Sequence, residues 1–285
     1  MFVVAGVTGH VGSVVARQLL AGGKKVKVIV RDAGRGADWS KKGAEVAVGS
    51  LDDQAFLTAT LMGAEGFFTL LPPNFAAPDF YAGQRVTVGA IASAVAAAKV
   101  PRVVILSSVG ADLATGNGPI RGLHLLENEL RATGTTLTAI RAGYFMENVG
   151  NALAPARGAG LYFNFMPSAD YPMPMIATED IGALAAKSLL ESPAKSETVD
   201  LQGPAYSQRQ LAAMLGAALG KTLQIVDVPE AGWVPAMVQG GLPPHVAEVF
   251  AEMYRGFATG IIKPSGDRMV HGTSTLDGVI KALVA

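Results

Sequence analysis

The feature that most constrains this chain is a glycine-spaced turn near its start. Residues 1–12 read MFVVAGVTGHVG, so glycines at 6, 9 and 12 stand three apart behind an apolar run. At a turn from strand to helix, one such glycine permits the tight turn, the next lets the backbone approach a pyrophosphate, and the third allows close helix packing. The helix start adds amide donors and a positive dipole. The motif predicts a dinucleotide-binding loop wherever strands and helices alternate around it.

That alternation continues for about half of the chain. Apolar runs bounded by turn residues predict strands at 2–7, 25–31, 44–49, 66–71, 102–107 and 135–141, and helical periodicity predicts helices at 10–21, 52–61, 79–98 and 121–133. The run from Val103 to Leu106 is apolar at every position, as a strand covered on both faces requires. We therefore expect an α/β fold with a Rossmann-like, doubly wound parallel sheet.

The composition and the pattern of the sequence change near residue 150. Residues 154–175 are rich in glycine, proline, methionine and aromatic side chains, and the regular alternation is lost. Helical patterns return at 178–191, 207–219, 243–257 and about 275–284, with a short strand at 223–228. We expect an NAD(P)-binding domain over 1–150 and a smaller α/β substrate-binding region over 151–285 packed against it, with a return of the chain to the main sheet left open.

Composition narrows the possible partners. Lys and Arg total 23, as do Asp and Glu, and there is no cysteine among the 285 residues. A balanced charge gives no electrostatic reason to bind nucleic acid or a membrane surface. Without cysteine, and without paired histidines at metal-ligand spacing, no metal site is expected. We expect a cytoplasmic protein, a monomer or a homodimer.

The end of the second predicted strand bears on the choice of dinucleotide. A basic side chain there pairs with a 2′-phosphate, whereas an acidic one accepts hydrogen bonds from ribose hydroxyls. Arg31 stands at this position with Arg35 close behind, and Asp32 lies between them. Arg31 favours NADP(H), and Asp32 leaves NAD(H) possible.

Further cofactor contacts follow from the rule that ligands lie outside the carboxyl ends of parallel strands. Besides Arg31, the expected set comprises the turn residues and the residues that end the third, fourth and fifth strands. These are Gly6, Thr8, Gly9, His10, Val11, Gly12, Ser50, Leu51, Leu70, Leu71, Pro72 and Ser107.

Several segments together resemble the NmrA-like, atypical short-chain dehydrogenase/reductase family. They are residues 6–12, the Val-Arg-Asp of 30–32, the Ile-Leu-Ser-Ser of 105–108, GTTLTAIRAGYFMEN at 134–148 and MIATEDIGALAA at 175–186. The resemblance implies a Rossmann-like domain with a small C-terminal substrate domain, and it places Gly143, Tyr144 and Phe145 beside the nicotinamide. Within the family, the chain looks most like bacterial NAD(P)H quinone oxidoreductases and flavin-free azo-dye or triphenylmethane-dye reductases.

The proton chemistry of ordinary short-chain dehydrogenases has no counterpart here. Those enzymes use a tyrosine with a lysine four residues on, which lowers the phenol pKa. None of the six tyrosines has a lysine at that distance, and no lysine occurs between Lys99 and Lys187. A conjugated acceptor needs less proton transfer, because its extended π system accepts hydride directly.

We therefore expect an NADPH-dependent reductase that passes hydride to a quinone, azo dye or triphenylmethane dye without flavin or metal. The stretch 161–166, with Tyr144 and Phe145, is the expected flat apolar slot for a small conjugated or aromatic substrate. The alternative is a non-catalytic NmrA-like sensor that binds NAD(P)(H) and signals its redox state to a partner.

Two catalytic candidates remain, Tyr144 and His124. His124 precedes Glu127 by three residues on a predicted helix, so the two side chains can face the same way. Such a pair is either a proton relay to the substrate oxygen or an ordinary pair on a helix surface. His10, inside the glycine turn, is expected to cover phosphate or face solvent and not to take part in the chemistry.

Overall fold

The main element of the fold is an eight-stranded sheet in which every neighbouring pair of strands is parallel. The computed structural model describes residues 1–191 and 193–285. The strand order is β13-β10-β6-β5-β4-β1-β2-β3. The bounds are β1 (Phe2–Val4), β2 (Val26–Val30), β3 (Glu45–Val48), β4 (Gly66–Leu70), β5 (Arg102–Ser108), β6 (Thr136–Ala142), β10 (Glu197–Gln202) and β13 (Arg268–His271).

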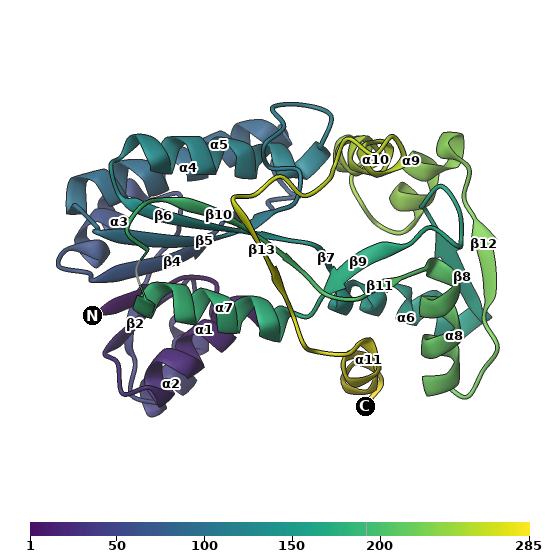
Figure 1. Cartoon of the computed structure of the whole chain (residues 1–285), viewed down its shortest axis with the longest axis horizontal. Helices are drawn as coiled ribbons and strands as arrows, with labels where there is room; N and C mark the ends of the chain where they lie inside the picture. The colour runs from purple at the N-terminus through teal and green to yellow at the C-terminus, as the bar shows by residue number, and fades with distance from the viewer. Residues whose placement is uncertain (192) are drawn as a thin grey trace.

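Helices cover both faces of this sheet (Figure 1). One layer holds α1 (His10–Ala21), α2 (Ala33–Lys41) and α7 (Thr178–Glu191), and the other holds α3 (Gln54–Leu61), α4 (Phe80–Ala98) and α5 (Arg121–Ala132). Phe67 and Phe68 are adjacent on β4, fully buried, and belong to the cores on opposite faces. Because successive side chains of a strand point to opposite faces, both faces must be covered. The expected doubly wound α/β fold is confirmed.

The second half of the chain contributes to this sheet as well as to a smaller region. Strand β10 pairs with β6, β13 pairs with β10, and α7 packs beside α1. Neither strand was predicted, since β10 reads ETVDLQ and β13 is four residues long and mostly exposed. The division into 1–150 and 151–285 stays a prediction about domains, and the return to the main sheet is made by α7, β10 and β13.

The smaller region lies beyond the carboxyl ends of the sheet (Figure 1). It holds a three-stranded sheet of β11 (Ala205–Tyr206), β9 (Met173–Ile176) and β7 (Tyr144–Phe145), and a parallel pair, β12 (Gln224–Asp227) with β8 (Leu161–Asn164). Its helices are α6 (Leu153–Ala159), α8 (Gln208–Ala218), α9 (Glu230–Gln239), α10 (Pro244–Ala258) and α11 (Leu276–Val284), and 3-10 turns span Gly118–Ile120 and Met146–Ala152. Met146, Met175, Leu215 and Leu276 anchor its core.

Three helices escaped the sequence prediction for local reasons. Helix α2 contains two glycines, α6 contains Pro155 and Gly158, and α9 contains Pro235, and both residue types lower helix propensity. Tertiary packing overrides that preference, as the burial of Trp39 on α2 and Trp233 on α9 shows. In the described part of the chain, no helix combines the length and apolar character that crossing a bilayer requires.

Candidate functional site

The glycine turn between β1 and α1 has the geometry that its spacing predicted. Gly6 has a φ of +70°, and an added Cβ would lie 2.5 Å from Leu70 Cδ2. Gly9 caps α1 without a side-chain hydrogen bond, and its nearest neighbour to an added Cβ, Gly6 O, is 3.5 Å away. A Cβ on Gly12 would lie 2.5 Å from Ala5 O and from Gly6 C and O. The three glycines therefore provide the turn, an open approach to the backbone, and close helix packing.

A pocket opens directly above this turn, at the carboxyl ends of β1 to β4. It has a volume of about 230 Å³. Seven residues of the expected cofactor set line it, and these are Gly6, Thr8, Arg31, Ser50, Leu51, Leu70 and Pro72. Gly49, at the end of the third predicted strand beside Ser50, was also expected to flank the adenine. The remaining lining residues were not predicted, and they are Ala5, Ile29, Val30, Asp52, Pro73, Asn74 and Thr87. Most of these neighbour a predicted residue in sequence, whereas Thr87 on α4 reaches the pocket only through helix packing.

Arg31 and Asp32 have different surroundings although they are adjacent. The Asp32 carboxylate caps α2, where Oδ1 accepts a hydrogen bond of 2.8 Å from the Gly34 amide. Arg31 lines the pocket with an exposed side chain, and Arg35 lies in the first turn of α2. A capping carboxylate is engaged with backbone, so its capacity to accept from ribose hydroxyls is reduced. The exposed guanidinium of Arg31 at this corner is able to pair with an anionic group.

The other expected cofactor residues lie outside the lining of that pocket. His10 is exposed at the start of α1, Val11 is buried beneath it, and Leu71 packs partly buried against the core under α3 and α4. Ser107 is buried and donates a hydrogen bond of 2.6 Å to Glu127 Oε1. The cofactor role of all these residues stays a prediction.

Gly143, Tyr144 and Phe145 form the link from the main sheet to the smaller region. The Gly143 amide donates to Leu201 O at 2.9 Å, which continues the β6–β10 pairing by one residue. Tyr144 and Phe145 then pair in parallel with Met175 and Ile176 of β9. Their backbone is thus held from both sides at the carboxyl edge of the sheet, and their contact with nicotinamide stays a prediction.

The expected pair between His124 and Glu127 is wrong. His124 Nδ1 lies 2.9 Å from Ala111 O, and its Nε2 lies 3.0 Å from Asn128 Nδ2. Glu127 instead turns toward the sheet and binds Arg141. A buried guanidinium needs a carboxylate partner, and that requirement outweighs any attraction between neighbours on the helix surface. Neither ring nitrogen of His124 has a carboxylate partner among the described residues, and the catalytic role of His124 stays a prediction.

Arg141 is the centre of a buried ionic cluster that sequence reasoning missed. Its Nε and Nη2 donate to the two oxygens of Glu127 at 3.0 and 2.8 Å, and its Nη1 donates to Ser265 Oγ at 2.9 Å. Burial, the largest single influence, acts to lower the pKa of Arg141. The hydrogen bonds to Glu127 and the negative charges of Glu127, Asp112 and Asp200 together outweigh burial and hold that pKa above its usual value. The missed signal is a charged residue inside the apolar run 137–142, which marks a buried ion pair.

Aromatic side chains from distant segments meet in the smaller region. Phe165 stacks on Tyr254 of α10 with ring centroids 5.5 Å apart, and Trp233 lies 5.8 Å from Tyr254. Burial raises the pKa of Tyr144, against opposing hydrogen bonds from the Asn148 and Tyr254 side chains. Tyr144 therefore stays protonated, and its hydroxyl is able to donate a hydrogen bond.

The substrate slot expected from residues 161–166 stays a prediction, because the side chains of this stretch point in different directions. Strand alternation on β8 turns Tyr162 and Asn164 inward and leaves Phe163 39% exposed. The Tyr162 hydroxyl donates to Gln208 Oε1 at 3.0 Å, so it has a structural partner. Of this stretch, Phe165 alone joins the stack on Tyr254, which lies too far along the chain for the sequence to reveal.

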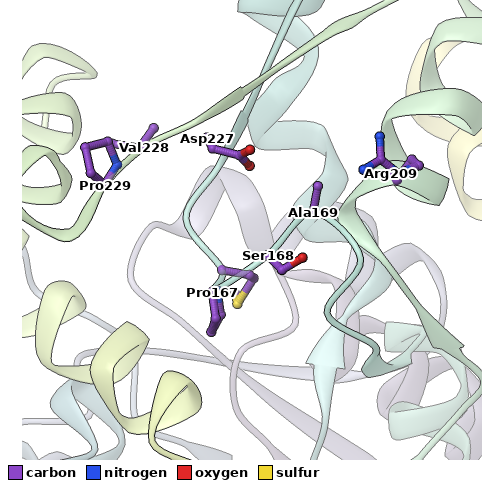
Figure 2. Close-up of a pocket in the computed structure, with 8 residues that line it drawn as sticks. Pro167, Ser168, Ala169, Arg209, Asp227, Val228 and Pro229 are labelled. Carbon is purple, nitrogen blue, oxygen red and sulfur yellow. The ribbon is translucent and has the colours of Figure 1, made fainter.

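A second pocket, of about 580 Å³, lies in the smaller region between the end of β8, the start of α8 and the end of β12. Figure 2 shows Arg209 on one side of it and Val228 and Pro229 on the other, with Asp227 between them and Ser168 below. Arg209 is already paired, since it donates to both oxygens of Asp170 at 2.7 and 2.9 Å. Within residues 1–191 and 193–285, no group of three or more His, Asp or Glu side chains is arranged to hold a metal ion.

Comparison with known proteins finds relatives that match most of the chain. The model of the NmrA-like family matches residues 1–271. The chain is 29% identical over 258 residues to NAD(P)H azoreductase of Xenophilus azovorans, covering 89% of this chain and 86% of that protein. It is 27% identical over 286 residues to quinone oxidoreductase 2 of Escherichia coli (strain K12), covering 97% and 96%. The structure of Citrobacter sp. triphenylmethane reductase complexed with NADP(H) superimposes with a TM-score of 0.83 at 20% identity, over 99% of this chain and 100% of that one.

Proposed function

The chain belongs to the NmrA-like family, and from that premise we propose that it is an NADPH-dependent reductase acting directly on conjugated acceptors such as quinones, azo dyes or triphenylmethane dyes. The family relatives named above include an azoreductase and a quinone oxidoreductase, which supports an NAD(P)H-dependent reductase in general. The preference for NADPH rests on this chain's own Arg31 and Asp32, the acceptor class follows the names of these relatives, and independence from flavin is part of the proposal.

The observation that carries the proposal is the corner formed by Arg31 and Asp32. The pocket lined by the glycine turn leads to an exposed arginine, while the neighbouring carboxylate is engaged in capping α2. A guanidinium at this place recognises the 2′-phosphate that distinguishes NADP(H) from NAD(H). Gly9 leaves the start of α1 open, so its amides are able to receive the pyrophosphate.

The residues at the other end of the site fit a reaction with little acid–base demand. Bound NADPH supplies the hydride. Tyr144, whose pKa is raised by burial, keeps its proton and is able to donate a hydrogen bond to an acceptor oxygen or nitrogen. No tyrosine has a lysine four residues on, so the chain does not have the usual pair that oxidises alcohols. Catalysis then depends mainly on positioning.

Turnover by the purified protein tests the activity. We expect NADPH oxidation, followed by its absorbance, to accelerate with at least one member of a panel of quinones, azo dyes and triphenylmethane dyes, and to be unchanged by added FMN or FAD. The sensor alternative predicts a different result, namely equal affinity for NADPH and NADP+ with no turnover on the whole panel. A strict need for added flavin would refute direct hydride transfer.

Cofactor choice is tested at Arg31. A charge-assisted hydrogen bond contributes about 1.5–3 kcal/mol, and an exposed one less, so Arg31→Ala is expected to weaken NADPH binding roughly tenfold. The affinity for NADH should not change. Lys41→Ala is the matched control, because it removes one exposed positive charge from the far end of α2, the helix that follows Arg31, without touching the pocket. Equal losses in the two variants would show that only the general positive charge near α2 matters.

A further inference from the structure

Glu147 links the segment after β7 to the start of α7, and the proposed reaction assigns it no role. It lies just after Tyr144 and Phe145, and its Oε1 accepts two hydrogen bonds from Thr178, one from the amide at 2.9 Å and one from Oγ1 at 2.5 Å. Thr178 is the first residue of α7. A carboxylate at the start of a helix satisfies an amide that has no partner within the helix and lies favourably in its dipole. Glu147 therefore caps α7 from a distant part of the chain.

The capped helix packs without a gap on the helix of the glycine turn. An added Cβ on Gly182 of α7 would lie 2.4 Å from Val14 Cβ and 3.0 Å from Val11 O, both on α1. Ile181 and Ala185 of α7 are fully buried in the same core as Val11 and Val15. Figure 1 shows the two helices side by side on one face of the sheet. Any movement of the first turns of α7 is therefore transmitted to α1.

The other end of the connection is the segment expected beside the nicotinamide. Tyr144 and Phe145 pair with Met175 and Ile176, and the same register, extended by two residues, brings Glu147 to Thr178. The two longest segments that mark the family resemblance, 134–148 and 175–186, thus meet at this one carboxylate. Its second oxygen, Oε2, is buried and has no hydrogen-bond partner within the described residues.

We propose that Glu147 is a positioning residue, which holds the segment beside the nicotinamide in a fixed place relative to the phosphate-binding helix. The inference rests on the proposed function, because it concerns the two ends of the same cofactor. The glycine turn and Arg31 hold the phosphates, and the Glu147–Thr178 bonds set how far Tyr144 and Phe145 lie from them. Hydride transfer requires reacting atoms within a narrow range of distance, so loss of this link affects turnover more than affinity.

The test compares Glu147→Leu with Glu147→Gln. Leucine fills similar space without an acceptor, whereas the glutamine amide oxygen is able to accept both Thr178 hydrogen bonds. Glu129→Leu, at an exposed position of α5, controls for the substitution itself. Each variant is measured for its NADPH affinity, for the fluorescence emission of bound NADPH, which reports the surroundings of the nicotinamide, and for kcat with an acceptor that the wild type reduces.

Glu147→Leu is expected to lower kcat on the order of ten- to a hundredfold and to shift the emission of bound NADPH. Its NADPH affinity should change by less than about threefold, because the phosphate contacts remain. Glu147→Gln and Glu129→Leu should match the wild type in all three measurements. If glutamine fails as leucine does, or if leucine leaves both kcat and emission unchanged, the positioning role is overturned.

Two further measurements distinguish a failure of the positioning role from misfolding of a variant and from a failure of the proposed function. Thr178→Val removes one of the two donors and is a milder change, so it should shift the same quantities in the same direction even if Glu147→Leu does not fold. Should the wild type reduce no acceptor at all, the proposed function fails. The emission of bound NADPH and the hydrogen exchange of amides 178–182 then still decide the positioning role, since both should change in Glu147→Leu and be restored in Glu147→Gln.

Discussion

Replacing Gly12 with alanine is expected to destabilise the whole protein, whereas the same change at Gly9 should affect only cofactor binding. A Cβ on Gly12 would lie 2.5 Å from Ala5 O and from two atoms of Gly6, all of them backbone. A Cβ atom does not approach a carbonyl carbon or oxygen this closely, so α1 must move away from β1. Overpacking of this kind costs about 1–3 kcal/mol, and the upper end applies because backbone cannot rotate away as a side chain can.

The gain in helix propensity offsets only part of that cost. Alanine is better than glycine inside a helix by up to about 1 kcal/mol, which leaves a net loss of roughly 2 kcal/mol. For a chain of this size, that loss corresponds to a decrease in Tm on the order of 4–8 °C. Thermal unfolding followed by circular dichroism measures it. Because α1 moves with the turn, NADPH binding should weaken as well.

Gly9→Ala is the matched comparison. Its nearest contact would be 3.5 Å, and its φ of −104° is open to alanine, so Tm should stay near that of the wild type. The added methyl group lies where a phosphate approaches the start of α1, so NADPH affinity should fall. An unchanged Tm in Gly12→Ala would refute the packing argument, and unchanged NADPH affinity in Gly9→Ala would refute the predicted role of the turn.

Three further outcomes are expected. Arg141→Met should lower the free energy of unfolding by about 3–5 kcal/mol, because the Glu127 carboxylate is left buried without the Arg141 guanidinium. Adding Glu127→Leu should restore part of that free energy. Denaturant titrations that show no recovery in the double variant would contradict the ion-pair explanation. Burial, with the Glu252 carboxylate, raises the pKa of Tyr81 from 10.0 to about 12, so the stability that Tyr81 contributes is complete below about pH 10 and is lost as pH rises through 12. Urea unfolding measured at increasing pH should therefore show a shallower decline of the free energy of unfolding in Tyr81→Phe than in the wild type. Parallel declines in the two proteins would contradict this contribution of Tyr81. Tyr144→Phe should lower kcat on the order of tenfold or more without changing NADPH affinity, and an unaltered kcat would remove Tyr144 from the reaction.

Much of the nucleotide-binding half could be predicted because its signals are local. The glycine spacing, the apolar strands and the helix periods each extend over fewer than about twenty residues, and they depend on backbone geometry and burial that act within one element. Helix α1 over 10–21 and helix α7 over 178–191 were predicted with the bounds they have. Seven residues chosen from the glycine turn and from strand ends line one pocket, because parallel strands bring their carboxyl ends to the same edge.

The tertiary structure alone decided the contacts between residues far apart in the chain. It turned Glu127 from His124 to Arg141, joined Glu147 to Thr178, and stacked Phe165 on Tyr254. It also placed β10 and β13 in the main sheet although their sequences are polar and short. Periodicity states which face of an element is buried, but not which distant element covers it. The partner of a buried charge or an aromatic ring is chosen by the packing of the whole chain, where the cost of leaving a buried charge or polar group unpaired outweighs local preference.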